Sequence, residues 1–413
     1  SASAGWRISE EAFMEPVKEV ISNLKLRASY GFTGNTEIGV YESLATLGTS
    51  NWILGNQLVS GFFPNKIPNP DLKWERTGQF DIGLDLGLFN NRLRITTDYY
   101  KKKTTDLLYS VAVPATSGYQ TMLKNIGSIE NQGYELSIES DNLTGAFSWT
   151  TAFNIAFNRN KVLELGGEEY KEMAEGDGHL KTGSVRRLIV GEPIGVFYGY
   201  RFDGIFQNEE ECKQQTSSAS PIGVGLRRYK DLNGDGKVDA ANDREILGDA
   251  NPKFFGGLTN TFAYKGFELN VFLQYSYGNK ILNYNAMELE NPTGGQNAYA
   301  DMVNRWTPEN PSNIYPKATT NRALLVSDRF IEDGSYLKLK TLSLSYSFPK
   351  INLKHIQGLR LYVTGQNLLT WTKYRGYDPE VSYRGASTLE AGEDFGGYPQ
   401  SRTFMFGIKL DIK

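Results

Sequence analysis

The sequence predicts an all-β protein, specifically an antiparallel transmembrane β-barrel, and three observations lead to this fold class. Segments of about ten residues alternate apolar and polar side chains, as tilted membrane-crossing strands do. The connections between them are either very short or very long. Aromatic side chains gather near the ends of the segments. The composition of the 413-residue chain, with 24 Tyr, 22 Phe and 43 Gly, is typical of strands joined by many turns.

The strand prediction rests on the period of two that a half-buried strand requires. In Gly266–Tyr277, for example, Phe267 and Leu269 fall on one face while Glu268 and Asn270 fall on the other. Counting Ser1–Arg7 as the end of a strand, we expect about eleven strands. The others are Leu24–Phe32, Phe80–Leu88, Leu93–Tyr99, Tyr134–Ser140, Gly145–Asn158, Leu342–Phe348, Leu359–Leu369, Phe404–Ile412 and, more weakly, Phe254–Tyr264.

Alternation alone does not separate a barrel from a soluble β-sandwich. The connections favour the barrel, because loops this long are uncommon in compact soluble domains, whereas outer-membrane barrels pair short periplasmic turns with long extracellular loops. Tight turns are expected at Asn90-Asn91, Asn142–Thr144 and Lys265-Gly266, and long loops at Asn35–Arg76, Arg159–Pro252, Lys280–Gly334 and Trp371–Ser401. A short amphipathic helix is predicted within Glu10–Ile21.

Aromatic residues near the strand ends are expected to form two belts at the lipid headgroups, with ordinary core aromatics as the alternative. They are Tyr99-Tyr100, Trp149, Tyr275, Tyr277, Tyr346, Phe348, Trp371, Tyr374, Phe404 and Phe406. An open sheet edge cannot lie in lipid, so an odd set of strands predicts that further strands lie upstream in a longer polypeptide. Ser1–Trp6 shows no signal peptide, which agrees with that expectation.

Composition argues against several other classes. The net charge of −3 gives no reason to expect a nucleic-acid partner, and no run of 18 apolar residues predicts a transmembrane helix. His179, His355 and the single Cys212 argue against a histidine-based zinc site or a Ser-His-Asp triad. Either acidic pair, Glu209–Glu211 or Asp378–Glu380, could be imagined as the two catalytic carboxylates of a glycoside hydrolase. Acidic loops produce such pairs readily, however. We therefore expect a protein that is not an enzyme.

One motif has clear metal chemistry, because oxygen-bearing residues alternate around Gly236 as in a calcium-binding loop. The candidate ligands are Asp231, Asn233, Asp235, the carbonyl of Lys237, Asp239 and Asp243. The pattern departs from an EF-hand at position twelve, where Asn242 replaces glutamate and Asp243 would close the site. The alternative is a solvated turn rich in Asn and Asp. A calcium here would be structural, ordering an extracellular loop.

Several local motifs in one order resemble the SusC/RagA-type, TonB-linked outer-membrane transporters of Bacteroidetes. The matching stretches are Ser3–Ser9, Asn69–Glu75, Asn125–Glu135, Asp231–Gly236, Gly365–Pro379 and the terminal strand. The resemblance implies that residues 1–413 form the C-terminal half of a 22-stranded barrel closed by a plug. The plug and the N-terminal domains would lie outside this chain.

The resemblance also implies TonB-dependent import of oligosaccharides, or peptides, across the outer membrane, together with a SusD-like surface lipoprotein. Asn154, Asn270 and Gln274 would face the lumen and tune passage, and Trp52 and Trp306 would be candidate sugar-stacking platforms. Two other classes stay open on the residues alone. One is a secreted, calcium-stabilised β-sandwich that binds carbohydrate, and the other is a passive porin.

Overall fold

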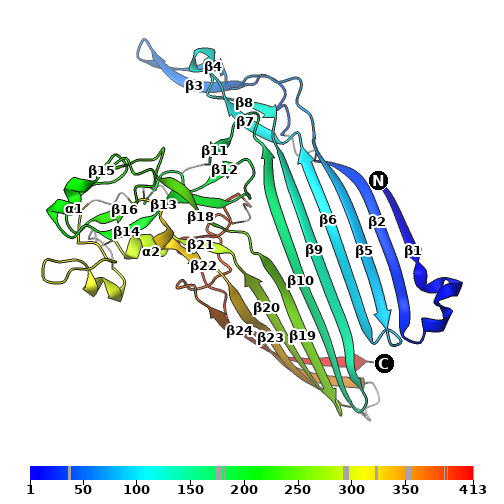
Figure 1. Cartoon of the computed structure of the whole chain (residues 1–413). Coiled ribbons are helices and arrows are strands. Elements are labelled where there is room, and N and C mark those ends of the chain that lie inside the picture. The colour runs from blue at the N-terminus through cyan, green and yellow to red at the C-terminus, as the bar shows by residue number, and fades with distance from the viewer. Residues whose placement is uncertain are drawn as a thin grey trace.

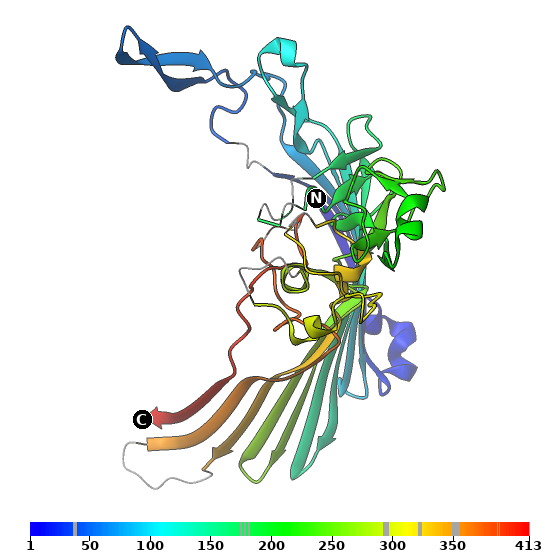
Figure 2. The same cartoon turned by 90° about the vertical axis from the view of Figure 1, so that its left-hand side faces the viewer.

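The structure is a computed structural model of the whole chain, and it is built on one large, curved sheet (Figures 1 and 2). It describes residues 1–35, 39–173, 176, 179–180, 182–291, 297–320, 324–348, 356–385, 387 and 389–412. Among these residues, no helix has the length and apolar character needed to cross a lipid bilayer.

The main sheet has eleven strands, and each strand pairs antiparallel with the next sheet strand along the chain. Its edge strands are β1 and β26. In order, the strands are β1 (Ala2–Arg7), β2 (Ile21–Asn35), β5 (Glu75–Leu88), β6 (Leu93–Thr105), β9 (Ser128–Thr144), β10 (Phe147–Glu164), β19 (Phe254–Tyr264), β20 (Phe267–Tyr277), β23 (Tyr336–Ser347), β24 (Ile356–Thr372) and β26 (Thr403–Ile412).

The all-β, barrel-type prediction is confirmed, and each predicted strand segment overlaps one strand of this sheet. The sandwich alternative needs a second sheet facing the first across a core. The remaining sheets of the described residues have only two or three strands each, and they belong to the loops. The prediction that residues 1–413 complete a barrel with upstream strands and a plug stays a prediction.

Short and long connections lie at opposite ends of the sheet, as predicted (Figure 1). One predicted turn is misplaced: β9 runs through Asn142 to Thr144, and the chain reverses at Gly145-Ala146. The pairing steps from Asp141↔Thr150 to Leu143↔Trp149, so Asn142 is the extra residue of a bulge. Its amide donates to Thr151 Oγ1 at 2.8 Å. The asparagine therefore adjusts the register instead of making the turn.

The predicted amphipathic helix within Glu10–Ile21 is also wrong in type. The segment forms two short 3₁₀ helices, η1 (Ile8–Glu10) and η2 (Ala12–Val17), at the end of the sheet that carries the tight turns (Figure 1). Pro16 lies inside η2 and has no N–H to continue an α-helical ladder.

The long loops contain the remaining elements and gather at the other end of the sheet (Figures 1 and 2). The strands are β3 (Leu47–Leu54), β4 (Gln57–Pro64), β7 (Leu108–Ala112), β8 (Thr121–Asn125), β11 (Tyr170–Glu172), β12 (Arg187–Ile189), β13 (Val196–Tyr200), β14 (Phe202–Ile205), β15 (Thr216–Ser217), β16 (Arg227–Tyr229), β17 (Lys237–Val238), β18 (Arg244–Asp249), β21 (Lys280–Asn283), β22 (Ile331–Asp333) and β25 (Glu393–Asp394). The helices are η3 (Ala115–Ser117), α1 (Glu209–Gln214), α2 (Tyr284–Leu289), η4 (Ala300–Asn304) and η5 (Asp328–Phe330).

The main hydrophobic core lies in these loops and not in the sheet. It joins side chains of the loop between β10 and β19 to those of the loop between β20 and β23, and we call this unit the loop body. Its largest buried cluster contains Leu180, Val185, Phe197, Leu247, Leu282, Tyr284, Ala286, Met287, Leu324, Val326 and Phe330. The wall of the barrel and the compact part of the molecule are thus two different regions of the chain.

Candidate functional site

The register divides the main sheet into an apolar face and a polar face. Leu26, Leu84, Leu136 and Ile155 share the apolar face, because Leu26 pairs with Leu84, both Leu84 and Leu136 pair with Thr97, and Leu136 pairs with Ile155. On the opposite face, one row runs from Asn154 through Gly257 and Gln274 to Lys338. A barrel with such a sheet would turn its apolar face to lipid and its polar face to a lumen.

The three residues predicted to line the lumen all lie on the polar face. Asn154 Oδ1 accepts a hydrogen bond from the N–H of Gly257 at 2.7 Å, and Asn270 Nδ2 donates to Thr261 Oγ1 at 2.9 Å. Gln274 Nε2 reaches the hydroxyl of Tyr336 at 3.3 Å and Glu380 Oε1 at 3.2 Å. Their placement agrees with the prediction, and their effect on passage stays a prediction.

The strongest electrostatic feature of the polar face is a lysine that the sequence did not single out. Lys338 is 1% exposed, and its Nζ lies 2.6 Å from Asp378 Oδ1 and 2.5 Å from Glu380 Oε2. Lys340, at the bulge of β23, also reaches Glu380 Oε2, at 3.1 Å. Asp378 and Glu380 belong to the loop between β24 and β26. This cluster therefore fastens a loop onto the wall.

The acid pair considered for glycoside hydrolysis is this same Asp378 and Glu380. Burial by itself raises the pKa of Asp378, but the hydrogen bond and positive charge of Lys338, together with the N–H groups of Glu380 and Gln400, outweigh it and hold that pKa below its usual range. Glu380 shows the same balance, with Lys338 and Lys340 lowering its pKa against the effect of burial. A general acid needs a raised pKa, so two carboxylates held ionised by lysines lack the pairing that glycosidases use.

A second ionic network joins the loop body to the loop between β24 and β26. Arg186 and Glu393 are both about fully buried, and Arg186 Nε donates to Glu393 Oε1 at 2.8 Å. The same guanidinium donates to the carbonyls of Gly195 and Ala391. Nearby, Arg375 contacts Glu290 and Glu332, each at 2.8 Å. Three separate loops thus meet through charged side chains, of which Arg186, Glu393 and Glu290 are buried while Arg375 is partly exposed.

The aromatic predictions are corrected at Tyr100, Tyr374 and Trp306, and the belt formed by the other aromatic residues stays a prediction. Tyr100 lies on the polar face, where its hydroxyl donates to Asn158 Oδ1 at 3.0 Å, so it is not part of a lipid-facing belt. Tyr374 is buried in the loops against Asp394. Trp52 is strongly exposed, whereas Trp306 is half-buried and donates to Gln207 Oε1 at 3.0 Å. Trp306 is therefore a packing residue of its loop, and Trp52 keeps the role of a candidate platform.

The predicted calcium loop folds as one tight turn within the loop body. Asp231 accepts the N–H groups of Gly234 and Gly236, each at 2.7 Å, and Asp235 accepts that of Lys237 at 2.8 Å. Asp243 is fully buried and holds the N–H groups of Leu232 and Asp239 at 2.8 and 2.7 Å.

The chemistry of these donors fits a hard cation, since all are oxygens on one short loop. Among the residues that the structure describes, however, no three His, Cys, Asp or Glu side chains converge closely enough to hold a metal ion. Lys237 Nζ also lies 3.1 Å from Asp239 Oδ2. Hydrogen bonds from the N–H groups of Asn242 and Ala241 and the contact with Lys237 lower the pKa of Asp239. Asp231 and Asp235 accept N–H groups of the loop itself, Asp243 holds its two ends together, and calcium binding by the loop stays a prediction.

Comparison with known proteins identifies the family. Residues 1–368 match the family described as "TonB dependent receptor-like, beta-barrel". TonB-dependent receptor P3 of Formosa agariphila is 40% identical over 417 residues, which cover 99% of this chain and 41% of that protein. TonB-dependent receptor SusC of Bacteroides thetaiotaomicron is 30% identical over 431 residues, covering 100% of this chain and 40% of that protein.

Solved structures give the same result. A structure of the RagAB peptide transporter superposes with a TM-score of 0.80 at 28% identity, covering 99% of this chain and 43% of that chain. The chain thus spans about two fifths of the length of the relatives it matches. The eleven-stranded sheet, its two faces and the matched family model together show that this chain belongs to the family of TonB-dependent receptor β-barrels, related to SusC and to the RagAB transporter.

Proposed function

We propose that this chain forms wall and extracellular loops of a TonB-dependent importer in the bacterial outer membrane. The single observation that carries the proposal is a sheet with one apolar face and one polar face that contains ion pairs. The compact loop body lies at one end of this sheet. The apolar face would contact lipid and the polar face would line the path of the cargo. The loop body would form the extracellular vestibule in which cargo is captured.

The cargo we propose is an oligosaccharide or a peptide. The structural relative named above is a peptide transporter, while the resemblance of the sequence motifs to SusC/RagA-type transporters implies oligosaccharides or peptides. Both classes fit a polar face rich in hydrogen-bonding groups. Energy for uptake would come through TonB, acting on a plug that other parts of the polypeptide would supply.

A surface lipoprotein of the SusD type is the partner we propose, and the β3–β4 hairpin is its candidate docking element. The hairpin projects away from the sheet beyond the loop end (Figures 1 and 2). Ile53 pairs with Leu58 and Thr49 with Phe62, so that Ile53, Leu58 and Phe62 share one face. These three side chains are each more than 70% exposed. Apolar surface of this kind marks a site of protein association.

We expect the double variant Ile53→Asp with Leu58→Asp to lose the lipoprotein partner. Two charges on the contact face would have to be desolvated without partners on binding. The test is co-purification of the full-length protein from detergent-extracted outer membranes, with quantification of the lipoprotein. Val303→Asp is the matched control, because Val303 is as exposed as Ile53, at 77%, but lies in another loop.

The same preparation identifies the cargo. Mass spectrometry of material released by denaturation should find bound oligosaccharides or peptides in the wild-type protein. Recovery of the full-length protein in the soluble fraction, with neither cargo nor lipoprotein, would overturn the proposal.

We also propose that the loop from Asp231 to Asp243 binds calcium as a structural ion. The expected result is that calcium protects this loop from proteolysis, and that Asp231→Asn with Asp235→Asn abolishes the protection. Each substitution removes a negative charge while keeping an oxygen and the side-chain size. Asp249→Asn, in β18 outside the loop, is the control. Equal protection by magnesium, or protection that survives the double substitution, would contradict a calcium site.

A further inference from the structure

On four neighbouring strands, the apolar face changes to a basic surface at the end nearest the long loops. The change from an aromatic to a basic side chain takes place within two residues. It runs from Tyr99 to Lys101 on β6 and from Phe157 to Arg159 on β10. It is continuous across strands, because Tyr99 pairs with Tyr134 and Tyr134 with Phe157. An aromatic row followed directly by charge is the pattern of a strand leaving hydrocarbon for the headgroup region.

The charges beyond that row are mostly positive. They are Arg76 on β5, Lys101 and Lys103 on β6, Glu130 on β9, and Arg159 and Lys161 on β10, with the neutral Gln132 on the same face of β9. Glu130 pairs with Lys101 at 3.1 Å. Among the described residues, no carboxylate lies within ion-pair distance of Arg76, Lys103, Arg159 or Lys161. The surface is basic although the chain carries a net charge of −3.

Part of this surface is hollowed into an amphipathic cavity of about 420 Å³. Its apolar walls are Tyr30, Phe32 and Phe80, and its basic side is formed by Arg76, Lys101 and Lys103. The register places the six side chains on one face, since Tyr30 pairs with Phe80, Phe80 with Lys101, and both Phe32 and Lys103 with Gly78. The guanidinium of Arg76 lies 3.9 Å from the centre of the Phe32 ring.

The missing side chain of Gly78 deepens the cavity. A Cβ at this position would lie 3.0 Å from Cε1 of Phe32, so any larger residue would occupy the space between the aromatic wall and Lys103. The hollow is thus open to a ligand with an apolar body and an anionic head.

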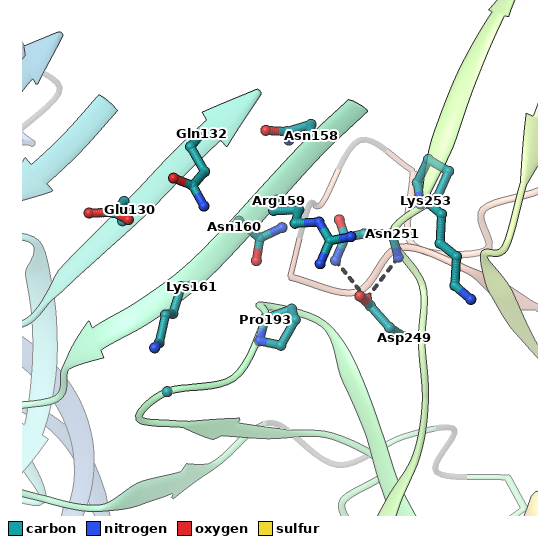
Figure 3. A pocket seen from close by; sticks show the side chains of 12 residues that line it. Glu130, Gln132, Asn158, Arg159, Asn160, Lys161, Pro193, Asp249, Asn251 and Lys253 are labelled. Carbon is teal, nitrogen blue, oxygen red and sulfur yellow. Dashed lines mark hydrogen bonds between the residues drawn. The ribbon is translucent and has the colours of Figure 1, made fainter. Parts of the chain in front are cut away.

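A second pocket, of about 340 Å³, continues the basic surface beyond β10. Figure 3 shows it between β10 and the start of β19, with Arg159 on one side and Lys253 on the other. Two acids line it: Glu130, which pairs with Lys101, and Asp249, which accepts hydrogen bonds from the backbone N–H of Asn251 at 2.8 Å and from its Nδ2 at 2.7 Å.

We propose that this surface binds the phosphate groups of a phosphorylated lipid in the membrane leaflet on the loop side. The acyl chains would lie along the aromatic row and the apolar strands, while Arg76, Lys101 and Lys103 hold the phosphates. Arginine and lysine favour phosphate oxygens through charge-assisted hydrogen bonds. The proposal rests on the membrane location put forward above, and it adds a lipid-binding site on the outside of the wall, separate from the polar face.

The test is native mass spectrometry of the full-length protein, stripped of lipid in neutral detergent and titrated with diphosphoryl lipid A. The triple variant Arg76→Gln, Lys101→Gln, Lys103→Gln should bind roughly a hundredfold more weakly, since each basic side chain near an anionic surface contributes about a fivefold change. The charge-matched control is Lys213→Gln, Lys230→Gln, Arg305→Gln, three exposed residues of the loops. It should bind as the wild type does. Lys102→Gln, on the polar face of β6, should also be silent.

Three results would overturn the proposal. The first is equal binding of lipid A by the triple variant and by its charge-matched control. The second is equal binding of a dephosphorylated lipid A by the wild type. The third is displacement of lipid A by inorganic phosphate at the same concentration. Loss of lipid binding with cargo and lipoprotein retained would leave the importer proposal untouched, so the two proposals fail separately.

Discussion

Replacing Arg186 with methionine should loosen the loop body by about 3 to 5 kcal/mol. The guanidinium is 1% exposed and provides the close positive charge for Glu393, which is equally buried. Removing it leaves the buried carboxylate with only the more distant Arg384, whose Nε lies 3.5 Å from Glu393 Oε2. Breaking the closer and fully buried side of such a pair has this typical cost. The carbonyls of Gly195 and Ala391 also lose their donor. Hydrogen exchange of the loop amides measures the free energy of local opening.

Two controls separate charge from packing. Arg94→Met removes an exposed pair with Glu139 on the sheet and should cost less than about 1 kcal/mol. The double variant Arg186→Met with Glu393→Leu should recover most of the loss, because replacing both members of a buried pair by apolar groups is often neutral. If Arg186→Met behaves like Arg94→Met, the pair does not hold the loops together.

Replacing Lys338 with methionine should release the segment around Asp378 and Glu380 from the wall, at a comparable cost of about 3 to 5 kcal/mol. Lys338 contacts both carboxylates, and Lys340 reaches only Glu380. Asp378 would then have neither of these two lysines within hydrogen-bond distance, and Glu380 would keep only Lys340. Limited proteolysis at residues 373–402 reports the release. Lys102→Met, a polar-face lysine that lies over the Tyr100 ring, is the control and should leave cleavage unchanged.

The same cluster predicts a pH dependence with a definite sign. Asp378 and Glu380 have lowered pKa values in the folded protein, so they stabilise loop docking at pH values above their unfolded pKa values. That contribution is lost as the pH falls through the folded pKa values, which places release of the loop below about pH 4. The Lys338→Met variant should lose its docking already near neutral pH. A loop equally protected at pH 3 and pH 7 in the wild type would contradict this account.

The strands of the main sheet were predictable because a period of two repeats over many residues. In β20, for instance, Phe267 to Tyr277 alternate with a single exception at Phe272, and the structure forms a strand over the same residues. Short strands carry too few residues for such a signal. The β3–β4 hairpin and the two-residue β17 therefore lie inside segments that the sequence marks only as loops.

The functional side chains were harder to predict, since their partners are distant in the chain. Lys338 and Asp378 are 40 residues apart, and Arg186 and Glu393 are 207 apart. A lysine at a polar position of an alternating strand is a weak signal that could have indicated Lys338. Nothing local distinguishes Arg186 from Arg187, although Arg186 pairs with Glu393 and Arg187 with Glu172. The prediction that Trp306 is a sugar-stacking platform failed for the same reason, because the burial of this side chain depends on a contact with Gln207 in another loop.

The position of the hydrophobic core has a consequence for assembly order. Phe197 and Leu247 come from the loop after β10, and Leu282 and Phe330 from the loop after β20, so their cluster requires both loops to have reached the same end of the sheet. Contacts between distant segments form late, because the chain entropy of closing the loops is lost before the contacts stabilise the product. The loop body therefore closes only after the strands between its two halves are in register. If β19 and β20 paired in the wrong register, the first visible effect would lie away from these strands. It would be an unfolded loop body that proteases can cut.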